Sequence, residues 1–96
     1  MLHIISRGSL EANLFERVGS TDAILFIEDA VLMLLKTASL SETLQNLAKK
    51  QRLSVLIEDI TIRGIAFEDL VANIKPVDYS GFVQLTLEHE VNYSWA

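Results

Sequence analysis

The sequence of 96 residues contains no cysteine, which excludes disulfides, thiolate metal ligands and cysteine nucleophiles. Its four glycines stand singly, so it has no glycine-rich loop of the kind that cradles phosphates. Basic residues are scarce, with 8 Lys and Arg against 13 Asp and Glu, for a net charge of -5. Such a chain lacks the positive electrostatic field that binding to a phosphate backbone requires. We therefore expect no autonomous binding of nucleic acid.

Long hydrophobic runs are also absent. The longest apolar region, residues 23–35, is interrupted by Glu28 and Asp29, so it is too short and too charged to span a bilayer. The amino terminus has no basic segment before its short apolar stretch, which argues against a signal peptide. We therefore expect a cytoplasmic protein without membrane contact, folded as one small domain over residues 1–96.

One short sequence pattern, which we call the repeated phrase, occurs twice in the chain. Residues 24–30 read Ile-Leu-Phe-Ile-Glu-Asp-Ala, and residues 54–60 read Ser-Val-Leu-Ile-Glu-Asp-Ile. Each apolar run has the length of a buried strand and ends in a Glu-Asp pair. The two pairs are 30 residues apart, about the length of one strand–helix–strand unit.

Apolar runs alternate with segments of helical pattern along the chain. The runs are continuous rather than alternating, as in parallel strands that are covered on both faces. We expect an α/β fold: a small three-layer α/β/α domain with a mostly parallel sheet and right-handed crossovers. The predicted strands are residues 1–5, 23–27, 53–57 and 77–79, and the predicted helical segments are residues 9–18, 30–35, 39–50, 59–64 and 80–89.

Small polar and acidic residues precede most of these helical segments. Such side chains accept hydrogen bonds from the free N–H groups of a first helical turn. The predicted helix caps are Ser9, Asp29, Ser39, Asp59 and Ser80.

The four acids Glu28, Asp29, Glu58 and Asp59 allow two interpretations. At the carboxyl ends of parallel strands, where ligands of open α/β sheets bind, they could hold Mg²⁺ and a small phosphorylated ligand. Alternatively, they cap helices and stabilise the positive ends of helix dipoles. Because no lysine stands in an evident partner position, we favour the second interpretation and predict no catalytic, cofactor-binding or metal-ligating residue.

Some apolar surface is expected to meet a partner, because half of the residues are apolar and the mean hydropathy is +0.31. Residues 30–35 are apolar around the full circumference of a helix, so this helix is either central to the core or part of an interface. The carboxyl-terminal tail carries two large aromatic residues, and we expect the fold or a partner to receive Trp95. The candidates for a subunit interface are Val31, Leu32, Leu34, Leu35, Tyr93 and Trp95.

The segment Val-Asp-Tyr-Ser-Gly-Phe-Val-Gln-Leu-Thr at residues 77–86 resembles the TusB/DsrH family of sulfur-relay subunits. The opening Met1-Leu2-His3 followed by Arg7, and the pair Arg63-Gly64 before the last third, extend the resemblance over essentially the whole chain. The resemblance implies the fold shared by DsrE-, DsrF- and DsrH-like proteins.

The resemblance also implies partners. Family members of this kind assemble with TusC-like and TusD-like sister subunits into a dimer of heterotrimers, a heterohexamer. A cysteine of the TusD-like subunit carries a persulfide, received from a TusA-like carrier and passed to a TusE-like one. The sulfur is used for 2-thiolation of the wobble uridine in tRNA.

Persulfide transfer requires a thiolate, and a chain without cysteine cannot carry the sulfur. The sequence therefore predicts a noncatalytic subunit of a TusBCD-like complex, which is not an enzyme by itself. Two alternatives remain open. One is a freestanding acidic-site domain that binds Mg²⁺ and a small phosphorylated ligand, and the other is a protein that associates only with copies of itself.

Overall fold

A computed structural model describes residues 1–7, 18–19 and 21–95 of the chain. The predicted helix that follows Ser9, and the cap assigned to Ser9, lie outside the described residues. All statements below concern the described part of the chain.

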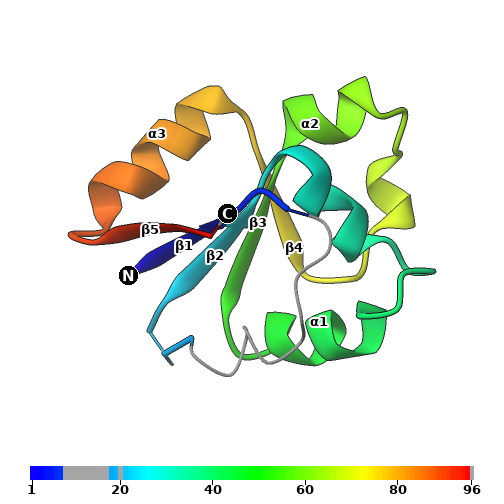
Figure 1. Ribbon diagram of the computed structural model, residues 1–96, viewed down its shortest axis with the longest axis horizontal. Coiled ribbons are helices and arrows are strands. Elements are labelled where there is room, and N and C mark those ends of the chain that lie inside the picture. The colour runs from blue at the N-terminus through cyan, green and yellow to red at the C-terminus, as the bar shows by residue number, and fades with distance from the viewer. Residues whose placement is uncertain (8–17, 20, 96) are drawn as a thin grey trace.

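The core of the fold is a parallel sheet of five strands in the order β4-β3-β2-β1-β5 (Figure 1). The predicted α/β fold with a parallel sheet is confirmed. The strands are β1 (Leu2–Ile5), β2 (Ala23–Phe26), β3 (Arg52–Leu56), β4 (Ile74–Val77) and β5 (Asn92–Trp95).

Helices cover the two faces of the sheet unequally. Figure 1 shows α3 on one face, whereas η2 and α1 lie on the other.

No helix in the described part of the chain has the length and apolar character needed to cross a membrane. The helical segments are η2 (Glu28–Leu34, a 3₁₀ helix), α1 (Ser41–Ala48), α2 (Ile57–Ile62), η3 (Phe67–Asp69, also 3₁₀) and α3 (Tyr79–Glu88).

Each central strand contributes to two apolar clusters because successive side chains point to opposite faces of a sheet. On β2, Ile24 and Phe26 face the larger cluster beneath η2 and α1, while Ala23 and Leu25 face the smaller cluster beneath α3. All four residues are buried. The unbroken apolar run in the sequence thus reflects a strand that is covered on both sides.

The last third of the chain departs from the prediction. Strand β4 begins at Ile74 rather than after Pro76, and it contains that proline. A proline removes one N–H group from the ladder, which is tolerated because β4 is an edge strand. The tail forms β5, which pairs with β1 at the opposite edge. Trp95 packs against the larger cluster, so the fold itself receives this ring.

Candidate functional site at the carboxyl edge of the sheet

The two Glu-Asp pairs lie where the adjacent strands β2 and β3 end, as the repeated phrase indicates. The first pair opens η2, and the second lies in the first turn of α2. The parallel register of β2 and β3 brings the two pairs to the same edge of the sheet.

Asp59 is buried and contacts the start of η2 rather than the start of its own helix. Its Oδ2 atom accepts a hydrogen bond of 2.6 Å from the backbone N–H of Glu28. Glu28 has a φ of +51°, in the left-handed region that a residue with a Cβ occupies at a cost of about 1–2 kcal/mol. The bond from Asp59 therefore helps to hold a strained turn in place.

Arg63, at the end of α2, joins the two acidic pairs. Its Nη2 atom lies 2.8 Å from Asp29 Oδ1, and Nη1 donates to the backbone oxygen of Asp59 at 3.0 Å. The same Nη1 atom lies 3.7 Å from Asp59 Oδ1. An arginine that the sequence pattern did not single out as a partner thus forms ion pairs with two of the four acids.

This arrangement does not favour a divalent cation. The described residues hold no group of three or more His, Cys, Asp or Glu side chains that could bind a metal ion. Asp59 Oδ2 is engaged by a backbone N–H, and Asp29 by the guanidinium of Arg63. The acids act here as structural partners, so the Mg²⁺ interpretation gains no support from their geometry.

Most of the predicted helix caps are wrong in detail. Asp29 lies inside the first turn of η2, and Asp59 lies inside the first turn of α2, so neither occupies the position that caps its own helix. Helix α1 begins at Ser41 after Leu40, without a side-chain cap, so Ser39 does not cap it. The cap of α3 is Asp78 rather than Ser80, and Asp78 accepts from the N–H of Gly81 at 2.8 Å.

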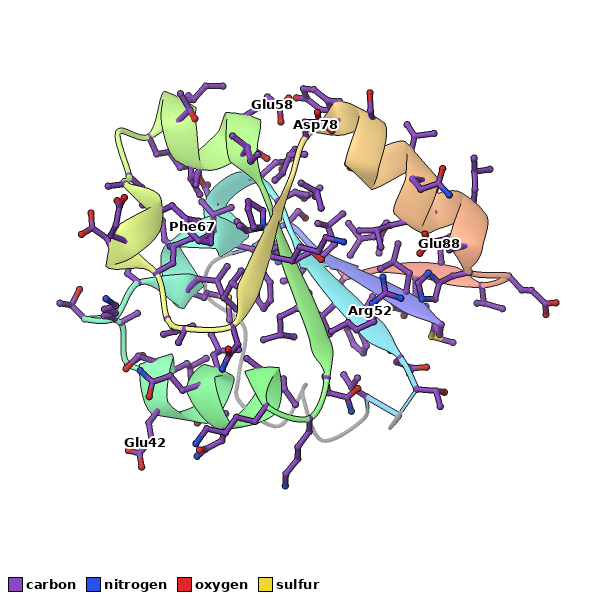
Figure 2. All side chains as sticks on the ribbon, turned by 180° about the vertical axis from the view of Figure 1, so that it is seen from behind. Glu42, Arg52, Glu58, Phe67, Asp78 and Glu88 are labelled. Atoms are coloured by element: carbon purple, nitrogen blue, oxygen red, sulfur yellow. The ribbon has the colours of Figure 1, made fainter. Side chains whose placement is uncertain are left out.

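The shift from Ser80 to Asp78 has a simple physical cause. Helix α3 begins at Tyr79, directly after Asp78, which places Ser80 inside the helix. Near this start, the Glu58 carboxylate accepts from the N–H of Tyr79 at 3.4 Å. Figure 2 shows Glu58 and Asp78 close together, where β3 and β4 end beside α3. The negative side chains complement the positive end of the helix dipole.

A second polar cluster, which the sequence did not reveal, lies around β1, between β5 and the start of β2. His3 on β1 is only 4% exposed, and its Nε2 atom lies 2.9 Å from Asp22 Oδ2. Its Nδ1 atom accepts a hydrogen bond of 3.0 Å from the indole N–H of Trp95, and the two rings stack. Because an indole N–H can only donate, Nδ1 carries no proton, and Nε2–H donates to Asp22.

Asp22 is the anionic end of this cluster. Hydrogen bonds from His3, from the amino-terminal ammonium and from the N–H of Gly19 hold the pKa of Asp22 well below its usual range. The charge on Asp22 therefore persists in acid, where an ordinary aspartate is neutral. The cluster connects the amino terminus, β1 and β5.

The predicted interface residues divide into accessible and inaccessible ones. Val31 and Leu34 are fully buried in the core of this chain, so they are not available to a partner. The reason is that η2 packs its apolar side chains against β2 and β3 rather than presenting them outward. Leu35 and Trp95 are half-buried, and Leu32 and Tyr93 are exposed.

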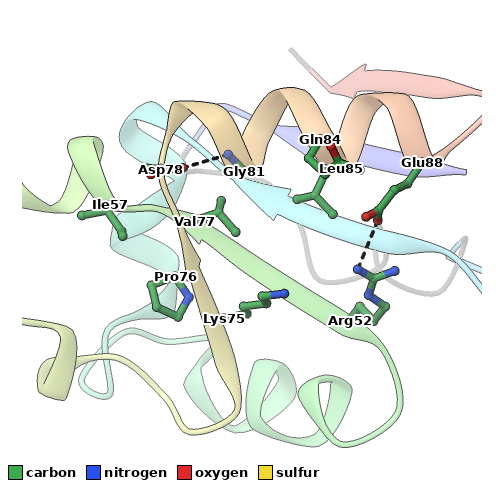
Figure 3. Close-up of a pocket in the computed structure, with 10 residues that line it drawn as sticks. All are labelled: Arg52, Ile57, Lys75, Pro76, Val77, Asp78, Gly81, Gln84, Leu85 and Glu88. Carbon is green, nitrogen blue, oxygen red and sulfur yellow. Dashed lines mark hydrogen bonds and ion pairs between the residues drawn. The ribbon is translucent and has the colours of Figure 1, made fainter.

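A groove of about 320 Å³ lies between β4 and α3 (Figure 3). The Arg52–Glu88 ion pair of 3.5 Å borders one end, and the Asp78–Gly81 hydrogen bond borders the other. Its two cations, Arg52 and Lys75, are balanced by its two carboxylates, so the groove has no net charge with which to select an ionic ligand. It is lined by Arg52, Ile57, Lys75, Pro76, Val77, Asp78, Gly81, Gln84, Leu85 and Glu88.

These features define a small, all-parallel α/β protein whose edge acids are bound to its own backbone and to arginine. Comparison with known proteins specifies the class further. The family described as DsrH like protein matches residues 7–92. The chain is 34% identical to Protein TusB of Pectobacterium parmentieri and 31% identical to Protein TusB of Buchnera aphidicola, in both cases over 99% of this chain and 100% of the relative.

The chain belongs to the DsrH-like (TusB/DsrH) family. It is also 37% identical to Protein TusB of Yersinia enterocolitica, over 85% of this chain and 83% of that protein. Its fold is similar to that of a protein of unknown function from Methanobacterium thermoautotrophicum. The TM-score is 0.73 at 14% identity, with 98% of this chain and 96% of the other covered.

Proposed function

We propose that this chain is a noncatalytic subunit of a cytoplasmic sulfur relay, in which persulfide transfer supports 2-thiolation of the wobble uridine in tRNA. Its partners in this proposal are TusC-like and TusD-like sister subunits, arranged as a dimer of heterotrimers. TusA-like and TusE-like carriers deliver and remove the sulfur without using this chain as an intermediate.

The observation that carries the proposal is the complete absence of cysteine in a member of the DsrH-like family. Sulfane sulfur is carried on a thiolate, and no other side chain replaces it in this chemistry. The polar clusters of the described residues support a structural role as well. Their acids bind backbone N–H groups, arginine and histidine of the same chain, and leave no nucleophile in an activated position.

The proposal is tested by deleting the gene and measuring 2-thiouridine in bulk tRNA by mass spectrometry. We expect loss of the thiolated nucleoside, restored by the wild-type gene on a plasmid. A strain in which the carrier cysteine of the TusD-like subunit is replaced by serine provides the matched control, because it should show the same loss. Unchanged thiolation in the deletion strain would contradict the proposal.

A further inference from the structure

Helix α3 has an apolar stripe on the side that faces away from the sheet. Tyr79, Val83 and Leu87 follow one another at intervals of four residues, which places them on one face of a helix. Their exposed fractions are 58%, 56% and 75%. We call these three residues the α3 outer stripe.

The opposite side of the same helix is also apolar. Leu85 is buried, and Phe82 packs against the smaller cluster beneath α3. A helix at the surface of a protein normally has one apolar and one polar face, whereas a helix that is apolar on two sides is covered on both. In the described part of the chain, nothing covers the outer stripe of α3.

The charged side chains at the two ends of the stripe are negative, whereas the cations Arg52 and Lys75 lie in the groove between α3 and β4. Asp78 and Glu90 flank the two ends of α3, and Glu58 reaches the N–H of Tyr79. Helix α3 itself contains no lysine or arginine. Arg52 pairs with Glu88, but no ion pair in the described residues involves Asp78, Glu90 or Glu58. The stripe is therefore an apolar surface with an acidic rim.

We propose that the α3 outer stripe is the surface on which a sister subunit docks, through an apolar patch rimmed by lysine and arginine. The inference rests on the proposed function for the identity of the partner. The chemistry of the partner follows from the acidic rim, since complementary charge around an apolar centre selects the partner and orients it. Tyr79 supplies the aromatic anchor that such interfaces favour.

A second copy of this chain does not satisfy the same surface. Two-fold pairing of α3 with α3 would place the stripe against itself, and the antiparallel arrangement would bring Asp78 of one copy towards Glu90 of the other. Like charges at the rim of an interface oppose association. The acidic rim thus favours a basic partner over self-association.

The inference is tested by co-expressing the tagged chain with its TusC-like and TusD-like subunits and measuring their binding to it. Val83→Gln and Leu87→Gln keep a good helix former at each position but remove the apolar contact. We expect the double variant to lower the affinity for the sister subunits at least about tenfold. Ile62→Gln, at a site on α2 that is 77% exposed, is the matched control and should bind as the wild type does.

The acidic rim is tested separately with Glu90→Lys. This variant should slow association and reduce the dependence of binding on salt concentration. Circular dichroism of each variant verifies that the fold is kept.

The outcomes separate this inference from the proposed function. If the wild-type chain binds its sister subunits and the double variant binds equally well, the docking surface is refuted while the proposed function stands. If the wild type itself fails to bind them, both are refuted. If the double variant instead abolishes a homodimer of the isolated chain, the stripe is a self-association surface, and a basic sister subunit is not its partner.

Discussion

Asp59 and Glu28, from the two copies of the repeated phrase, are joined by a hydrogen bond of 2.6 Å between a buried carboxylate and a backbone N–H. A residue of the second copy of the phrase therefore holds the strained Glu28 of the first copy in place. Arg63 joins the same cluster, because it contacts both Asp29 and Asp59. These contacts give Asp29 and Asp59, at the ends of adjacent strands, partners within the chain itself.

Replacing Asp59 by alanine should lower the free energy of unfolding by about 2–3 kcal/mol. The change leaves the N–H of Glu28 without an acceptor and removes the carboxylate beside Arg63. Urea unfolding followed by circular dichroism measures the effect. Asp29→Asn is the control and should cost less than about 1 kcal/mol, because the Asp29–Arg63 pair is exposed on the aspartate side. Equal effects at both positions would contradict the structural role of Asp59.

Glu28→Gly should raise the free energy of unfolding by up to about 1 kcal/mol. Glycine adopts a φ of +51° without the steric cost of a Cβ, and this gain exceeds the entropy that glycine loses on folding. The same substitution at Glu42, inside the right-handed helix α1, should instead destabilise by about 1 kcal/mol. Thermal unfolding of the two variants compares the signs. Destabilisation by Glu28→Gly would show that its side chain has a role beyond the turn.

Trp95→Phe should destabilise the protein by about 1 kcal/mol. The ring remains able to pack, but the Nδ1 atom of the buried His3 loses its donor. Circular dichroism in urea is the suitable measurement, since the substitution removes the single tryptophan of the chain. Tyr93→Phe, whose side chain is exposed on the same strand, should change the stability by less than about 0.5 kcal/mol.

Asp22→Asn should destabilise the protein at neutral pH by about 1–3 kcal/mol, with a difference from wild type that shrinks in acid. A carboxyl whose pKa is lowered by folding stabilises the folded state fully above the pKa of the unfolded chain, about 3.9 for aspartate. This stabilisation is lost as the pH falls further towards the lower pKa of the folded state. Urea unfolding at intervals from pH 7 to about pH 2 measures the trend, with the exposed Glu42→Gln as the control. A constant difference over this range would contradict the role of His3 and the ammonium group.

Millimolar Mg²⁺ should leave the thermal unfolding midpoint unchanged, compared with NaCl at the same ionic strength. A ligand that binds only the folded state raises the midpoint. Here Arg63 and the N–H of Glu28 already engage Asp29 and Asp59. A saturable rise in the midpoint that Asp29→Asn abolishes would instead support the Mg²⁺ interpretation of these acids.

The sequence predicted where the first three strands lie along the chain, because each is a mostly apolar run that ends in a sharp change of polarity. The prediction is wrong at β4, because the strand contains Pro76 and does not begin after it. Only pairing with β3 reveals that β4 is an edge strand, in which a proline is tolerated. The tail lacks a continuous apolar run, so β5 depends on pairing with β1.

The candidate site was also predicted only in part from the sequence. The repeated phrase predicted that two acidic pairs share an edge of the sheet, since parallel strands present their carboxyl ends together. It could not predict the partners of Asp59 or Asp78, because a side chain near a helix start can reach its own helix or a neighbouring one. The burial of Val31 and Leu34 was equally hidden, as an apolar segment has the same composition in a core and at an interface.

The sequence by itself determined that this protein has an α/β fold of parallel strands and that no residue of it can carry a persulfide. The first follows from local apolar patterning, and the second from the absence of a thiol. Only the tertiary structure decided that the repeated acids are bound to Glu28 and Arg63, and that the outer stripe of α3 stays uncovered among the described residues. Both depend on how elements far apart in the chain pack together, which local composition does not specify.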